Sequence, residues 1–273
     1  FQANVGLEIA GATTPAEPEH GLLSLRRAEV NVIRNGVQKP PQSGDLYVRP
    51  TSIPDLLKPY LSRISLVDRL RETRAFFGFD RLATDNSFLE TKALPDDIMR
   101  QLFRSPPREQ TWLPAVQAHG EGIFYELREE AIDEWLHRNA AAIEKRIDDQ
   151  FINNLIEVRN AHPPLGEATR DWAARFVLVH TTAHCLINQL VFECGYSSAS
   201  IKERLYISAD GSAPMAGVLL YTAAGDSEGT LGGLVRLGNP DRFGPLFERA
   251  LNRAYWCSSD PVCSEDLGGR GAR

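Results

Sequence analysis

The sequence predicts a mixed α/β fold in which long amphipathic helices pack on a small sheet, preceded by an irregular N-terminal region rich in proline and glycine. Three observations predict it. An apolar repeat of helical period follows Gly166, a continuous apolar run of strand length occupies Gly217–Tyr221, and prolines interrupt the first 60 residues. At 273 residues and 42% hydrophobic content, the chain can bury a substantial core.

The N-terminal segment, residues 1–60, is expected to consist of extended pieces and loops. Pro40–Pro41 and Pro50 interrupt every candidate element there, because proline lacks the amide that helices and inner strands need. The first residue is Phe1, with no basic stretch and apolar block after it, which favours an excised fragment of a larger protein over a secreted start.

A middle region, residues 61–165, is expected to be α+β. From residue 61 to about 78, an apolar spacing of three predicts an amphipathic helix: Ile64, Val67 and Leu70. A strand is predicted over His119–Leu127. A long helix is predicted to follow and to end before His162, with these residues on its apolar face: Ile132, Trp135, Leu136, Ile143, Ile147 and Leu155.

The last region, residues 166–273, is expected to be α/β. A second long helix runs to about Cys194, where Gly195 provides a stop, and its core stripe comprises Trp172, Phe176, Val179, Ala183, Leu186 and Leu190. Ser200–Glu203 fits a capping box on a short helical turn. The apolar strand Gly217–Tyr221, a glycine-rich turn and two further helices, over 230–237 and 245–255, complete the region.

Composition excludes a uniformly basic nucleic-acid-binding surface and a membrane span. The net charge is −6, so any DNA contact must be local. The best candidates are Arg63, Arg69, Arg71, Arg74, Arg236, Arg242, Arg249 and Arg253, although the favoured interpretation of such clusters is a solvated helix face. No apolar stretch reaches the roughly 18 residues that a spanning helix needs. Four cysteines are too few for a disulfide framework, which favours the cytoplasm.

Gly225–Gly229 matches the G-x-S-x-G pattern of a nucleophile elbow, between a strand and a helix. A serine hydrolase using Ser227 needs a histidine later in the chain, and all six histidines come earlier. The favoured alternative is a turn that binds an anion or a partner through its backbone amides, formed by Gly225, Asp226, Ser227, Gly229, Gly232 and Gly233.

His180 and His184 are four residues apart on one predicted helix, which is the spacing by which zinc proteases hold their metal. Thr181 stands where those enzymes carry a glutamate, so hydrolysis by that route is unsupported. The favoured interpretation is a structural one, with core histidines bonded to a carbonyl or carboxylate. A structural metal site that combines His184 with Cys194 is the alternative.

Cys257 and Cys263 flank an Asp-Pro turn that would bring both thiolates to one point. A structural zinc site needs four ligands, and this pair supplies two. The residues alone therefore leave zinc binding and two free surface thiols equally open.

Four segments together resemble a known family: the zinc-binding region of MrfA-type helicases and, more closely, the DrmB subunits of the bacterial DISARM anti-phage system. The segments are Val179–His184, Gly195–Arg204, Tyr221–Leu234 and Trp256–Cys263. The resemblance implies that Cys257 and Cys263 are the first ligands of a zinc site that a later segment completes.

The resemblance further implies a non-catalytic subunit that binds a helicase similar to DrmA and helps it to hold DNA. DNA binding is then expected through the complex, with no membrane partner. Two alternatives stay open: a serine hydrolase using Ser227, and a zinc-stabilised scaffold without contact to nucleic acid.

Overall fold

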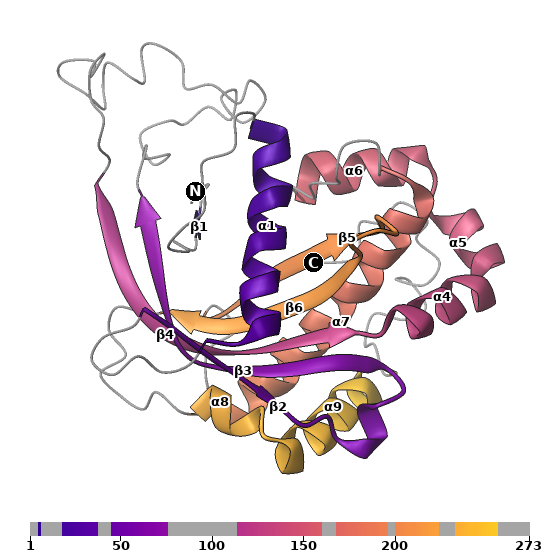
Figure 1. Ribbon diagram of the computed structural model, residues 1–273. Coiled ribbons are helices and arrows are strands. Elements are labelled where there is room, and N and C mark those ends of the chain that lie inside the picture. The colour runs from indigo at the N-terminus through magenta and orange to yellow at the C-terminus, as the bar shows by residue number, and fades with distance from the viewer. Residues whose placement is uncertain are drawn as a thin grey trace, which may run out of the picture. The chain divides into compact units, whose positions relative to one another are not determined.

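The predicted fold class is confirmed by the computed structural model, which describes residues 5–6, 18–37, 45–75, 114–159, 168–195, 200–223 and 233–255. Within these residues, six strands form one sheet in the order β1-β3-β4-β6-β5, with β2 also paired to β3 (Figure 1). Their bounds are β1 Val5–Gly6, β2 Leu46–Thr51, β3 Leu61–Ala75, β4 Ala115–Leu127, β5 Ile201–Ser208 and β6 Met215–Ala223.

The chain divides into two compact units. The first comprises Phe1–Glu8 and Arg71–Ala118, and its described part includes β1, which pairs antiparallel with β3 at Val5↔Arg74. The second comprises Ile9–Leu70 and His119–Arg273, and it contains the hydrophobic core and all described helices.

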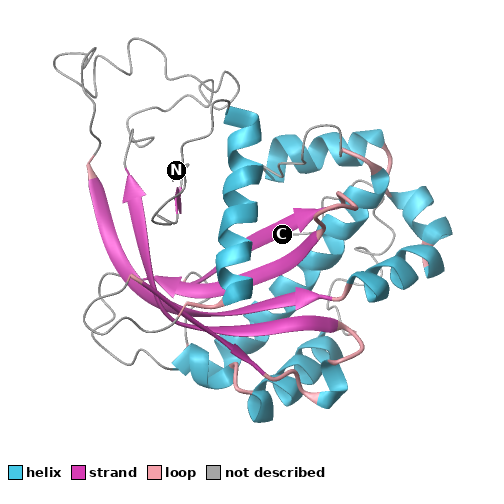
Figure 2. Ribbon diagram, viewed as in Figure 1, coloured by secondary structure: helices cyan, strands magenta, loops and turns pink. Residues whose placement is uncertain are grey.

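The second unit has helices on both faces of β5 and β6 (Figures 1 and 2). On one face lies α1 (Pro18–Asn35), whose Arg26 stands 5.8 Å from the ring centre of Tyr206. On the other lies α7 (Arg170–Cys194), against which Leu205 and Ile207 pack. Adjacent β5 residues point to opposite faces. The remaining helices are η1 Asp55–Leu57, α4 Glu129–Arg138, α5 Ala140–Arg146, α6 Asp149–Arg159, α8 Gly233–Leu237 and α9 Pro240–Ala254.

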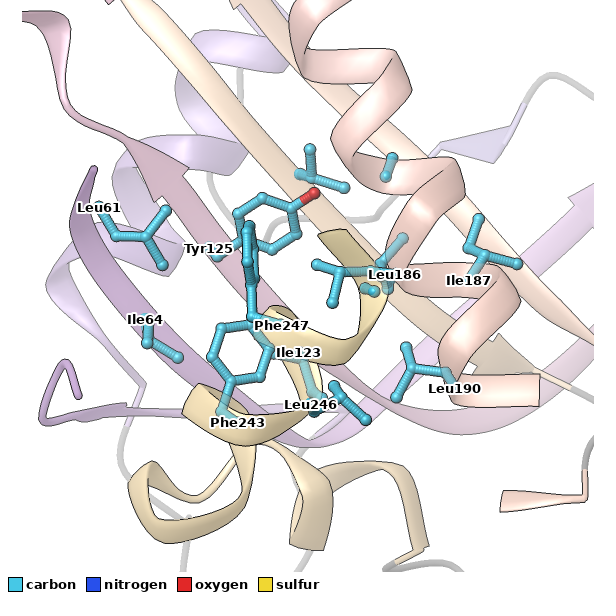
Figure 3. Packing of buried hydrophobic residues seen from close by; sticks show 14 of the residues in the cluster. Leu61, Ile64, Ile123, Tyr125, Leu186, Ile187, Leu190, Phe243, Leu246 and Phe247 are labelled. Carbon is cyan, nitrogen blue, oxygen red and sulfur yellow. The ribbon is translucent and has the colours of Figure 1, made fainter. Parts of the chain in front are cut away.

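The main core is built on β4. The Tyr125 ring meets Phe243 and Phe247 of α9 at centre-to-centre distances of 6.3 and 6.0 Å, and Leu186 of α7 belongs to the same cluster (Figure 3). Strand β6 is buried along nearly its whole length, as its continuous apolar run predicts. It lies between β4 and β5 and pairs antiparallel with both, at Phe124↔Leu219 and Leu205↔Val218.

Two predictions about elements before β4 are wrong. Residues 61–75 form strand β3, not a helix. Side chains on both faces of this strand are buried, so its apolar residues need not alternate with polar ones. In the N-terminal segment, residues 18–35 form the helix α1, not an extended piece. Its buried face includes the carboxylate Glu29 beside Val30 and Ile33, which weakens the apolar signal.

The single long helix predicted after β4 is three helices in series, α4, α5 and α6. Asn139 ends α4, and its side chain donates to the Trp135 carbonyl at 2.8 Å. Ile147 is extended, and the Asp148 carboxylate then accepts the Phe151 amide at 2.7 Å. The breaks preserve most of the predicted apolar face, because these residues are buried: Ile132, Ile143, Ile147 and Leu155.

The second predicted helix is confirmed as α7. Its stripe is buried throughout at Trp172, Phe176, Val179, Ala183, Leu186 and Leu190. The strand predicted over His119–Leu127 is confirmed within β4, and the two last helices are confirmed as α8 and α9. Helix α9 begins at Pro240, five residues before its predicted start, so that Pro245 lies inside the helix. Among the described helices, none has the length and hydropathy to cross a bilayer. The boundaries proposed at residues 60 and 165 remain predictions.

Candidate functional site

Helix α7 holds two histidines one turn apart. The Thr169 hydroxyl accepts the Trp172 amide at its start, and Gly195, with φ of 70°, ends it in the left-handed conformation. Residues four apart on a helix share a face, so His180 and His184 point the same way. Their Nε2 atoms are 3.0 Å apart.

Strand β5 brings a carboxylate to these histidines. Glu203 Oε1 lies 3.2 Å from His180 Nε2 and 3.7 Å from His184 Nε2. The three side chains thus form one compact group, in which every potential ligand atom lies within 4.8 Å of the others. We call His180, His184 and Glu203 the His-His-Glu cluster.

The cluster lies at the edge of the core and is open to solvent on one side. The exposed fraction of the side chain is 20% for His180, 46% for His184 and 26% for Glu203. The Phe176 ring packs against His180 at 5.6 Å between centres and limits where that imidazole can go. His184 is therefore not the core histidine that the sequence predicts, although both histidines do meet a carboxylate.

Glu203 supplies the negative charge of the cluster. Burial raises the pKa of its carboxyl, but hydrogen bonds and positive charge from His180 and His184 outweigh burial and hold the pKa at about 2. Its second oxygen, Oε2, is buried and has no hydrogen-bond partner among the described residues. A buried carboxylate oxygen without a donor is costly, so hydrogen bonds among the described residues do not fully satisfy this carboxylate.

Sequence reasoning missed Glu203 because Ser200–Glu203 matches a capping box. The structure shows the strand β5 from Ile201, so the predicted helical turn is wrong. The signal that could have found it is the alternation of side chains between the two faces of a strand. Arg204 and Tyr206 are buried beside α1, whereas Glu203 and Leu205 lie on the α7 side.

The predicted pairing of His184 with Cys194 is also wrong. Both belong to one continuous helix, and ten residues at 1.5 Å each separate them by about 15 Å along its axis. These backbone positions are too far apart for one ion, whose ligand atoms lie about 2 Å from it.

The glycine-rich turn is described only at its end. Gly225, Asp226, Ser227, Gly229 and Gly232 lie outside the described residues, and Gly233 is the first residue of α8. The next amide, that of Leu234, donates to the buried Glu121 carboxylate at 2.9 Å. The Leu234 amide, at this end of the turn, is therefore already bonded to the Glu121 carboxylate of β4. The anion- or partner-binding role of the turn stays a prediction.

Cys257 and Cys263 lie outside the described residues, so their role as zinc ligands stays a prediction. Of the remaining candidates, several predicted DNA-contacting arginines have protein partners. Arg74 pairs with Glu72, Arg249 with Glu193, and Arg63 donates to the Arg34 carbonyl.

Comparison with known proteins gives two matches. The MrfA Zn-binding domain family matches residues 182–271, which include His184 and Glu203 of the cluster and both Cys257 and Cys263. The chain is also 36% identical over 229 residues to the DISARM protein DrmB of Bacillus paralicheniformis. That alignment covers 81% of this chain and 37% of the relative, so the chain spans little more than a third of that protein's length.

Proposed function

The chain belongs to the family of the DISARM protein DrmB, and from this premise we propose that it is a non-catalytic subunit of a DISARM defence complex in the bacterial cytoplasm. In this role it binds a helicase subunit similar to DrmA and helps that helicase to hold DNA. The observation that carries the proposal is the 36% identity over 229 residues. Zinc is the cofactor that the matched domain family implies.

The surface best suited to a helicase partner is formed by the C-terminal ends of α7 and α9. Phe192 of α7 is 75% exposed, and the Arg253 guanidinium of α9 lies 5.1 Å from its ring centre. Exposed aromatic and arginine side chains are the residue types that dominate interface energies. We therefore place the helicase contact at Phe192 and Arg253.

Copurification with the helicase subunit from the native host tests this assignment. The parent protein is expected to retain the helicase, and Phe192→Ala is expected to weaken binding by about 2 kcal/mol. Tyr60→Ala is the matched control, because Tyr60 is also a solvent-exposed aromatic residue, at 58%, and belongs to another part of the fold. If the two variants retain the helicase equally well, the contact does not involve Phe192. If the unmutated protein retains no helicase, the proposed partnership is wrong.

The proposed DNA contact uses exposed arginines of α8 and α9. Arg236 and Arg242 are exposed, and Arg242 pairs only loosely, at 3.9 Å, with its neighbour Asp241. In an acidic protein, such local charges can contact phosphate only where a partner positions the DNA. The slope of log affinity against log salt is negative, and each phosphate contact that is lost should make it less negative by about 1. Arg138→Ala, which removes an exposed arginine on α4, serves as the control.

Two alternatives lead to different outcomes. Covalent labelling of Ser227 by a fluorophosphonate would support a serine hydrolase and refute the non-catalytic role. A zinc-stabilised scaffold without nucleic-acid contact would leave the DNA affinity of the helicase unchanged when the chain is added.

A further inference from the structure

We infer that the His-His-Glu cluster binds a divalent transition-metal ion of the zinc type, with His180, His184 and Glu203 as its protein ligands. The inference does not rest on the proposed function, because it concerns the coordination chemistry of three side chains in one chain. Two elements build the site: α7 supplies His180 and His184, and β5 supplies Glu203.

The separations between the ligand atoms fit one ion. Two atoms bound to zinc at about 2.0 to 2.1 Å and at the tetrahedral angle lie about 3.3 Å apart. The three separations in the cluster are 3.0, 3.2 and 3.7 Å. A circle through atoms so spaced has a radius of about 1.9 Å, so an ion at about 2.05 Å from each lies about 0.7 Å out of their plane. The three atoms thus occupy one face of a tetrahedron.

The donor set selects the kind of ion. Imidazole nitrogens favour zinc and its neighbours in the first transition series, whereas magnesium and calcium favour oxygen ligands. Three protein ligands leave one coordination position for water or for a group from elsewhere. The His184 side chain is 46% exposed, so solvent water can reach the cluster.

Hydrogen bonding alone leaves part of the cluster unexplained. A hydrogen-bonded triad would account for Oε1 of Glu203, which both histidines approach, but not for Oε2. That oxygen is buried without a hydrogen-bond partner among the described residues. A metal ion beside the carboxylate satisfies its negative charge and gives the second oxygen an electrostatic partner.

Titration of the intact, chelator-treated protein with Co²⁺ tests the site. Cobalt bound by nitrogen and oxygen has visible d–d bands, and cobalt bound by thiolate adds an intense charge-transfer band in the near ultraviolet. The double variant Cys257→Ser/Cys263→Ser is expected to keep the d–d bands and to lack the charge-transfer band. His184→Ala and Glu203→Gln are expected to weaken the cobalt affinity of this site by at least about 100-fold, beyond the loss of an outer-shell partner.

The controls are His137→Ala and Glu144→Gln, which alter exposed residues of α4 and α5. If His184→Ala and Glu203→Gln bind Co²⁺ as tightly as these controls do, the site does not exist. The same conclusion follows if excess Mg²⁺ displaces Co²⁺ as effectively as Zn²⁺ does. If the double cysteine variant does not fold, mass spectrometry can compare the metal content of His184→Ala with that of the unmutated protein. One ion fewer in His184→Ala supports the site, and equal metal content overturns it.

Discussion

Arg204 of β5 and Glu29 of α1 form a buried ion pair in which the arginine Nε donates to Glu29 Oε2 at 2.7 Å. The side chains are only 6% and 1% exposed. Burial lowers the pKa of Arg204, but hydrogen bonding and the charge of Glu29 outweigh burial and raise it above its usual value. The pair holds α1 on the sheet, together with Arg34–Glu126 and Arg27–Asp210.

Replacing Arg204 alone should be strongly destabilising. Arg204→Met removes the closest partner of the buried Glu29 carboxylate and leaves it the longer contact to Arg26, at 3.5 Å, which should cost about 3 kcal/mol of the free energy of unfolding. The double variant Glu29→Met/Arg204→Met should recover much of that loss. Arg49→Met is the control, since the Arg49–Asp68 pair is more exposed and should contribute about 1 kcal/mol at most. Urea denaturation gives the free energy of unfolding of the unmutated protein and of the three variants. Equal losses for Arg204→Met and Arg49→Met would contradict the larger contribution of the buried pair.

Gly120 should tolerate no side chain. A Cβ atom there would lie 1.5 Å from the Thr222 carbonyl oxygen, where β4 pairs with β6. Gly120→Ala is therefore expected to cost about 3 kcal/mol or more, because the backbone of two central strands must separate. Gly211→Ala, in a turn with no atom within 4 Å of the added Cβ, should change stability by about 0.5 kcal/mol at most. Thermal melting compares them, and a neutral Gly120→Ala would refute this register.

The Glu121 carboxylate should stabilise the start of α8. Glu121→Ala leaves the buried Leu234 amide without its acceptor, which costs about 1 to 3 kcal/mol. Glu121→Gln keeps an acceptor oxygen and should cost less. The free energy of unfolding distinguishes the two variants. Equal losses would show that the amide does not depend on this oxygen.

Alkaline pH should destabilise the fold through two buried tyrosines. Burial raises the pKa of Tyr125 and of Tyr206 well above that of a free phenol. A raised pKa contributes stability below the pKa of the unfolded state, about 10, and that stability is lost as pH rises above it. In an ultraviolet titration of the seven tyrosines, these two should ionise only as the protein unfolds. Tyr206→Phe should reduce the number that ionise late, and simultaneous ionisation of all seven would contradict the burial.

Elements with a uniform environment could be predicted from the sequence. Helix α7 and strand β6 are buried along a stripe or throughout, so their apolar patterns are clear. Helix α1 could not be predicted, because it lacks a wide apolar face. Ion pairs at Glu29 and Arg34 attach it to the sheet instead.

The candidate site could be predicted only in part. The spacing of His180 and His184 is a local signal, readable along one helix. Glu203 joins them through the packing of α7 on β5, a contact that local motif reading cannot supply. The capping-box match at Ser200 was a competing local signal, and strand pairing with β6 overrode it.

Because the proposed role of the chain is to help a helicase to hold DNA, the DNA affinity of that helicase tests this role most directly. Fluorescence anisotropy with labelled DNA would measure the dissociation constant with and without the chain across a range of salt concentrations. The proposed role predicts that the chain tightens binding by at least about tenfold, which is about 1.4 kcal/mol, and that the gain shrinks as salt rises. An affinity that the chain leaves unchanged at every salt concentration would contradict it.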